Sequence, residues 1–170
     1  MPWIGVSIAV PEPWGSELQQ YRIDVGDDSA RQIPTHITLL PPLEVADADL
    51  APITAHLLEA AKRTAPFQVH LRGTGTFRPV SPVVFINVVK GISGCEQLAG
   101  DVRSGPLVLD TEFPYHPHVT VAHYLPEGLL EQAFVELERY DAQFDVSEMW
   151  LYLHDPRSGW HPVRSFPLGE

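Results

Sequence analysis

Two short segments of the chain carry the same alternation of polar and apolar residues. The first, at 34–40, reads Pro-Thr-His-Ile-Thr-Leu-Leu, and the second, at 117–123, reads Pro-His-Val-Thr-Val-Ala-His. On a β-strand alternate side chains share a face, so His36 and Thr38 would point one way and their apolar neighbours the other. His118 and Thr120 would do the same. Each strand thus offers one imidazole and one hydroxyl on the face opposite its core-facing residues.

The pairing of the two segments carries more information than either one alone. A random chain with this content of His and Thr would hold roughly 0.4 His-x-Thr triplets, and a single triplet is most simply a strand with a polar outer face. Here there are two, both in apolar runs, and they lie 82 residues apart in a chain of 170. The repeat therefore predicts two halves that contribute one His/Thr pair each to a shared site.

Two facing histidines suggest acid–base chemistry without a metal. Near neutral pH one imidazole can accept a proton from an attacking water or hydroxyl while the other protonates a departing ribose oxygen. The two threonine hydroxyls could donate hydrogen bonds to the non-bridging phosphate oxygens as charge grows there. The pattern therefore points to displacement at phosphorus.

Composition and charge narrow the range of partners. The formal net charge is −11 and the 11 basic residues are spread thinly, whereas proteins that follow a nucleic-acid backbone normally present a basic patch. Long duplex nucleic acid is therefore not an expected partner. No apolar run is long enough to span a bilayer, and the start of the chain lacks the features of a signal peptide. The single Cys95 fits a reducing compartment. We therefore expect a cytoplasmic protein, and we also expect it to be a monomer.

The rest of the chain alternates between strands and helices. Both motif strands are followed by a proline break, an amphipathic helix and a strand that opens with Phe-x-Val, at Phe67 and at Phe144. This order predicts an internal duplication of roughly 80 residues. The expected strands are 3–10, 34–40, 67–72, 83–89, 117–124, 144–153 and 160–166, and the expected helices are 15–25, 49–64, 94–103 and 127–140, with Pro41-Pro42 ending the first motif strand.

In its two motifs, its duplication and its length, the chain resembles the 2H phosphoesterase superfamily, in particular the 2′-5′ RNA ligase and cyclic phosphodiesterase-like branch. The resemblance covers nearly the whole chain and implies one bilobal α+β domain, with two antiparallel sheets flanking a central groove and helices outside. It implies metal-independent chemistry, with no cofactor, on 2′,3′-cyclic or 2′-5′ phosphodiesters of a nucleotide or RNA end. By motif match the catalytic set is His36, Thr38, His118 and Thr120, with His118 favoured as base and His36 as acid.

The second motif departs from the family pattern at one position. Members similar to the RNA ligases often have Arg where this chain has His123, and an imidazole is charged only at lower pH. With the acidic net charge, this favours a small cyclic phosphate or nucleotide end over long RNA and hydrolysis over ligation. His123, Tyr115 and Tyr124 are the candidate substrate-binding residues, because the tyrosines could stack on a base.

Other functions remain open at this point. His116, His118 and His123 could form a zinc site, although on a regular strand His123 falls on the face opposite His118 and no carboxylate or cysteine lies close in sequence. A module that binds a nucleotide or phosphoester without turnover would need the same His/Thr pairs. A serine or cysteine hydrolase is less well supported, because the chain has no Gly-x-Ser-x-Gly elbow.

Overall fold

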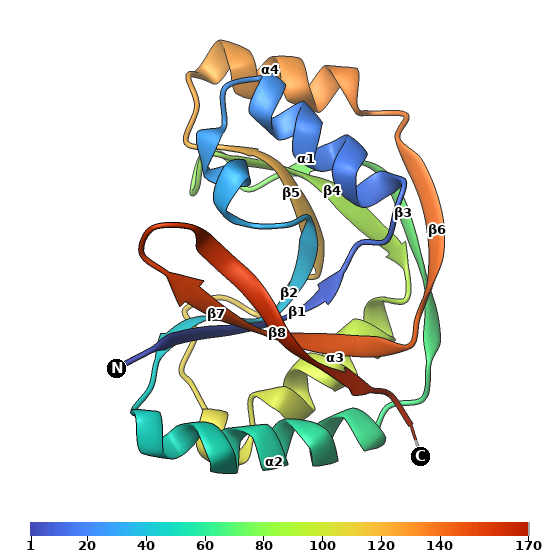
Figure 1. Cartoon of the computed structure of the whole chain (residues 1–170). Coiled ribbons are helices and arrows are strands. Elements are labelled where there is room, and N and C mark those ends of the chain that lie inside the picture. The colour runs from blue at the N-terminus through green and yellow to red at the C-terminus, as the bar shows by residue number, and fades with distance from the viewer. Residues whose placement is uncertain (170) are drawn as a thin grey trace.

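Two four-stranded antiparallel sheets with helices on their outer faces make up the molecule, as the computed structural model shows for residues 1–169 (Figure 1). The α+β prediction is confirmed. In chain order the elements are β1 (Trp3–Ala9), α1 (Trp14–Asp24), the 3₁₀ turn η1 (Asp28–Gln32), β2 (His36–Glu44), η2 (Asp47–Asp49), α2 (Leu50–Lys62), β3 (Phe67–Thr76), β4 (Val83–Lys90), α3 (Ile92–Val102), η3 (Gly105–Leu107), β5 (His118–His123), α4 (Glu127–Glu136), β6 (Asp141–Val146), β7 (Glu148–Asp155) and β8 (Gly159–Pro167).

The two motif strands lie at corresponding edges of the two sheets. The first sheet has the order β2-β1-β7-β8 and the second the order β5-β4-β3-β6, so that β2 and β5 are both edge strands beside the first strand of their half. These two edges also contact each other, and Figure 1 shows them side by side at the centre of the molecule. The fold thus brings together two segments that are 82 residues apart in sequence.

The connections between strands cross from one lobe to the other. Helix α1 follows β1 of the first sheet but packs on β5 of the second. The ring of Trp14, at the start of α1, lies 6.2 Å from that of Phe144 on β6 of the same second sheet. Helix α3 follows β4 of the second sheet but packs on β2 of the first. Buried residues of both lobes form one continuous core, which includes Leu18 of α1 and Leu98 of α3.

Each motif strand contains a β-bulge directly after its threonine. In β2, Ser7 pairs with Thr38 and Val6 with Leu40, so Leu39 is the extra residue. In β5, Phe85 pairs with Thr120 and Val84 with Ala122, so Val121 is the extra residue. A bulge resets the alternation of faces, and accordingly two consecutive apolar residues are buried after each threonine.

The expectation that Pro41-Pro42 would end the first motif strand is wrong. Strand β2 continues to Glu44, and the prolines lie between the pairs Val6–Leu40 and Ile4–Leu43, at a second irregularity of an edge strand. Proline is tolerated at such places, because its missing N–H leaves no ladder hydrogen bond unmade.

The strand expected at 144–153 is in fact two strands in different sheets. Strand β6 pairs with β3, and after the single residue Ser147 the chain enters β7, which pairs with β1. The two Phe-x-Val segments, at Phe67 and Phe144, were expected to be equivalent positions of the two halves. They are antiparallel neighbours instead, because Phe67 pairs with Val146 and Phe144 with Val69.

None of the helices within residues 1–169 is long and apolar enough to cross a membrane.

The turn between β7 and β8 packs against η1, the segment that precedes the first motif, through Gly159. This residue has φ +89°, and a Cβ built on it would overlap the backbone oxygen of Gln32. We expect Gly159→Ala to lower the free energy of unfolding by about 1–3 kcal/mol, as measured by urea denaturation.

Gly100→Ala is the matched control for this substitution. Gly100 lies in α3 with open space around its Cα, so alanine there is expected to raise stability by about 0.5–1 kcal/mol through helix propensity. Equal stability of wild type and Gly159→Ala would contradict the close packing of this turn on η1.

Candidate active site

The two motif histidines are oriented by the same local hydrogen bond. Nδ1 of His36 lies 2.8 Å from the carbonyl oxygen of Pro34, and Nδ1 of His118 lies 2.7 Å from that of His116. A carbonyl oxygen only accepts hydrogen bonds, so Nδ1 is the protonated nitrogen of each neutral ring. Both histidines therefore present an unprotonated Nε2 that is free to exchange a proton with a ligand.

Both imidazoles are held in the neutral form by their surroundings. Burial lowers the pKa of His36 to about 4; the hydrogen bond to Pro34 opposes this shift, while the charges of Arg22 and His118 add to it. Burial also lowers the pKa of His118. An anion bound between the rings would favour their protonated forms.

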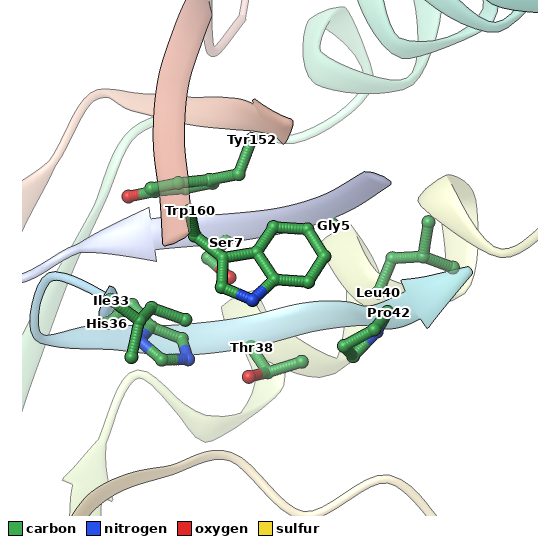
Figure 2. Close-up of a pocket in the computed structure, with 9 residues that line it drawn as sticks. All are labelled: Gly5, Ser7, Ile33, His36, Thr38, Leu40, Pro42, Tyr152 and Trp160. Carbon is green, nitrogen blue, oxygen red and sulfur yellow. The ribbon is translucent and has the colours of Figure 1, made fainter. Parts of the chain in front are cut away.

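His36 and Thr38 share a small cavity of about 30 Å³ with Trp160 of β8. Figure 2 shows both side chains on the same side of β2 and the indole of Trp160 lying over the strand, its nitrogen directed toward them. Trp160 is partly exposed and lines this cavity.

A much larger cavity, of about 990 Å³, opens on the other side of Thr38 and reaches His118. Thr38 lines both cavities, and together they are called the groove below. The walls of the large cavity are rich in aromatic residues, among them Phe77, Phe113 and Tyr115. Its volume and lining suit a small organic ligand.

The remaining predicted catalytic residue, Thr120, lies on β5 two residues after His118 and is partly exposed. It does not line either of the two cavities described. Its assignment as a catalytic residue stays a prediction.

His123 lies on the same side of β5 as His118, and the expectation that the two would face opposite ways is wrong. The bulge at Val121 shifts the alternation by one residue, so that the polar positions 118, 120 and 123 are all partly exposed between buried neighbours. In β2 the third residue after the motif threonine is Pro41, which lines the large cavity beside His118. The corresponding residue of β5 is His123.

His123 is bound into a buried cluster of charged residues. Its Nδ1 donates to Asp27 Oδ2 at 3.2 Å, and the Nε and Nη2 atoms of Arg22 donate to the same oxygen at 3.0 and 2.8 Å. Arg22 is 4% exposed and Asp27 is 3% exposed. Burial alone would raise the pKa of Asp27, but the hydrogen bonds from His123 and Ser29 and the charge of Arg22 outweigh burial and hold that pKa well below its usual range.

The two candidate tyrosines occupy different environments. The hydroxyl of Tyr115 donates to the carbonyl of Thr38 at 2.7 Å, and its ring packs 5.0 Å from the guanidinium of Arg103. Tyr124 is 72% exposed, contacts the ring of His123 and lies outside the two cavities described. Tyr115 thus belongs to the groove, whereas Tyr124 lies beyond it.

Sequence reasoning missed Arg22 and Arg103, which the fold brings close to the motif residues from helices that cross between lobes. Arg103 lines the large cavity, and the charge of the buried Arg22 acts on His36. Neither belongs to a motif, and no local pattern marks a helix whose packing partner lies in the other half. The guanidinium of Arg78 is bound to Glu127 and Glu131 of α4, at 2.6 and 3.2 Å.

The alternative of a zinc site requires His116, His118 and His123 to lie close together as metal ligands. In the part of the chain that the structure describes, no group of three His, Cys, Asp or Glu side chains lies close enough to hold a metal ion. His123 is held by Asp27, whereas His116 is exposed at the opening of the large cavity.

Comparison with known sequences identifies relatives along most of the chain. A protein of Staphylococcus epidermidis (strain ATCC 12228 / FDA PCI 1200), named "Putative phosphoesterase", is 27% identical over 169 residues, which cover 98% of this chain and 99% of that one. A protein of Bacillus cytotoxicus, named "Putative phosphoesterase Bcer98_0945", is 27% identical over 140 residues, or 81% of each chain.

Solved structures share the fold over the full length. Escherichia coli LigT without ligand has a TM-score of 0.69 at 18% identity, covering 100% of this chain and 99% of that one. LigT complexed with 3′-AMP has a TM-score of 0.66 at 21% identity, with full coverage of both chains. Usb1 of Kluyveromyces marxianus has a TM-score of 0.55 at 14% identity, covering 98% of this chain and 97% of that one.

The two His/Thr pairs thus stand on adjacent edge strands of a fold that LigT shares, and the sequence model of one family matches residues 10–157, both motifs included. The chain belongs to the 2′-5′ RNA ligase superfamily of 2H phosphoesterases.

Proposed function

We propose that the chain hydrolyses 2′,3′-cyclic or 2′-5′ phosphodiesters of a nucleotide or RNA end by acid–base catalysis between His36 and His118. The observation that carries this proposal is the matched orientation of the two rings, each with Nδ1 fixed on a backbone carbonyl and Nε2 left free. One free nitrogen takes the proton of the attacking water, and the other gives a proton to the departing ribose oxygen.

The threonines are assigned to the phosphate oxygens. Thr38 lines both cavities between the two histidines, and Thr120 occupies the matching place on β5. Hydroxyl donors at these positions would hydrogen-bond to the non-bridging oxygens, where negative charge increases in the transition state.

The pKa values of the two histidines shift in the same direction. Burial lowers the pKa of His36 to about 4 and also lowers that of His118. Because both imidazoles are disfavoured as cations in the free protein, the roles of acid and base are assigned by the family resemblance, with His118 as the base and His36 as the acid.

Replacing either histidine tests the proposal directly. His36→Ala and His118→Ala are each expected to lower kcat for a nucleoside 2′,3′-cyclic phosphate by about 10²–10⁴-fold, while circular dichroism shows a folded protein. His70→Ala is the matched control, because His70 lies on β3 and bonds to Asp141. The reaction is run with EDTA; loss of the wild-type rate with the chelator and its return with zinc would overturn the metal-free proposal.

The leaving group distinguishes the acid from the base. A 4-nitrophenyl phosphodiester releases an oxygen that needs no protonation, so loss of the acid matters less for it than for the cyclic nucleotide. His36→Ala should therefore lose far less activity on this ester than on the cyclic substrate, whereas His118→Ala should lose activity equally on both. The opposite result would exchange the two assignments, and binding without turnover of any ester would favour the non-catalytic module.

The pH dependence should separate the free enzyme from its complex. The active form carries one proton, shared by His36 and His118. In the free protein both histidine pKa values lie below the usual 6.5. As the pH rises above 6.5 the pair therefore loses this proton and the active form disappears. We expect kcat/KM to peak below pH 6.5 and to decline towards pH 8, and kcat, which reports the complex, to peak at higher pH because the phosphate raises both pKa values. A kcat/KM optimum at or above pH 8 would contradict this electrostatic account.

A further inference from the structure

We propose that Arg103 binds a second anionic group of the substrate, a phosphate monoester distinct from the phosphodiester that is cleaved. This inference rests on the proposed function for the position of the first phosphate, between His36 and His118. Three arginines, Arg22, Arg78 and Arg103, lie in or near the groove, and two of them are paired with carboxylates.

At the His36 end the buried cation is already neutralised. Arg22 donates two hydrogen bonds to Asp27, and the same carboxylate also accepts from His123. Near the large cavity, Arg78 is likewise paired, with Glu127 and Glu131. Because carboxylates neutralise the guanidinium groups of Arg22 and Arg78, neither group is expected to bind an anionic ligand.

Arg103 at the His118 end has no such partner. Its Nε donates to the carbonyl of Leu39 at 2.8 Å, and its guanidinium packs against the ring of Tyr115. Within residues 1–169 no hydrogen bond or ion pair is made by Nη1 or Nη2, and the residue lines the large cavity. Two donor groups of a fixed cation are therefore available to an anion, in the geometry that suits a phosphate.

The bulge in β2 explains why Arg103 is held so firmly. Leu39 is the extra residue of the bulge, and an extra residue is left unpaired in the ladder. Nε of Arg103 supplies a hydrogen bond to its carbonyl. Tyr115, which supports the guanidinium from one side, is itself fixed by its bond to the carbonyl of Thr38.

The position of Arg103 separates it from the reacting phosphorus. It is attached to β2 at Leu39, three residues beyond His36, and a strand rises about 3.3 Å per residue. The attachment point therefore lies roughly 10 Å along the strand from His36, on the side of the large cavity. One phosphate between His36 and His118 and a second at Arg103 would then lie within the span of a single nucleotide.

The walls of the large cavity fit the part of the ligand between the two phosphates. Phe77 and the 58%-exposed Phe113 offer aromatic surface for a base or sugar. Glu112, exposed on the same wall, is the one carboxylate among the lining residues, and its charge opposes an anion. Glu112→Gln should therefore strengthen binding of the second phosphate.

Binding can be measured without turnover. The probes are adenosine 2′-monophosphate and adenosine 2′,5′-bisphosphate, with dissociation constants from isothermal titration calorimetry. Wild type should bind the bisphosphate at least about tenfold more tightly, the effect expected of one charge-assisted phosphate–arginine contact. Arg103→Met should bring the ratio close to one with little change for the monophosphate, and Arg103→Lys should retain part of the preference.

Arg139→Met is the matched control, because Arg139 is exposed and lies outside both cavities. It should keep the wild-type ratio. A wild-type ratio near one, or an equal loss of both ligands in Arg103→Met, would overturn the proposal, since the second case assigns Arg103 to the first phosphate or to folding. Turnover of a 2′,3′-cyclic nucleotide is scored separately, so failure of the reaction and failure of the second phosphate site give different results.

Discussion

One extra residue in each motif strand determines the geometry of the groove. Leu39 and Val121 each follow a motif threonine, and both are fully buried. In a regular strand the side chain three positions after the threonine would point away from the motif histidine. Because the alternation resets there, Pro41 and His123 return to the side of the motif histidines. In β2 the same irregularity leaves the Leu39 carbonyl to Arg103.

The electrostatics of the groove follow from burial rather than from a nearby charge alone. Two imidazoles that are both neutral cost little to bury, whereas a permanent imidazolium would require a counter-ion. In the proposed reaction the anionic substrate would be that counter-ion, and the protonation state needed for catalysis would be reached mainly in the complex. In the Asp27 cluster the carboxylate is permanent, and it is compensated by a permanent guanidinium.

The resemblance of the two motifs to those of a known family predicted the class of fold, and a period of two places the His and Thr of each motif on one face. The sequence could not predict the bulges, which depend on the partner strand, and so it placed His123 on the wrong face. For the same reason it predicted a strand end at Pro41 and Pro42. Arg22 and Arg103 were missed because their roles depend on helices that cross to the other lobe, and Phe144 was matched with Phe67 although the two strands are neighbours in one sheet.

The crossing connections also bear on how the chain reaches this structure. Strand β3, from the first half of the chain, lies between β4 and β6 of the second sheet, and β7 and β8, from the second half, complete the first sheet. Neither half can therefore satisfy its own backbone hydrogen bonds. Many of these pairings join residues far apart in sequence, such as Ile4 with Leu153, and such non-local pairing slows folding. We therefore expect the two lobes to form in one cooperative step, and a ribosome-bound chain to stay without a complete first sheet until its last strands have emerged.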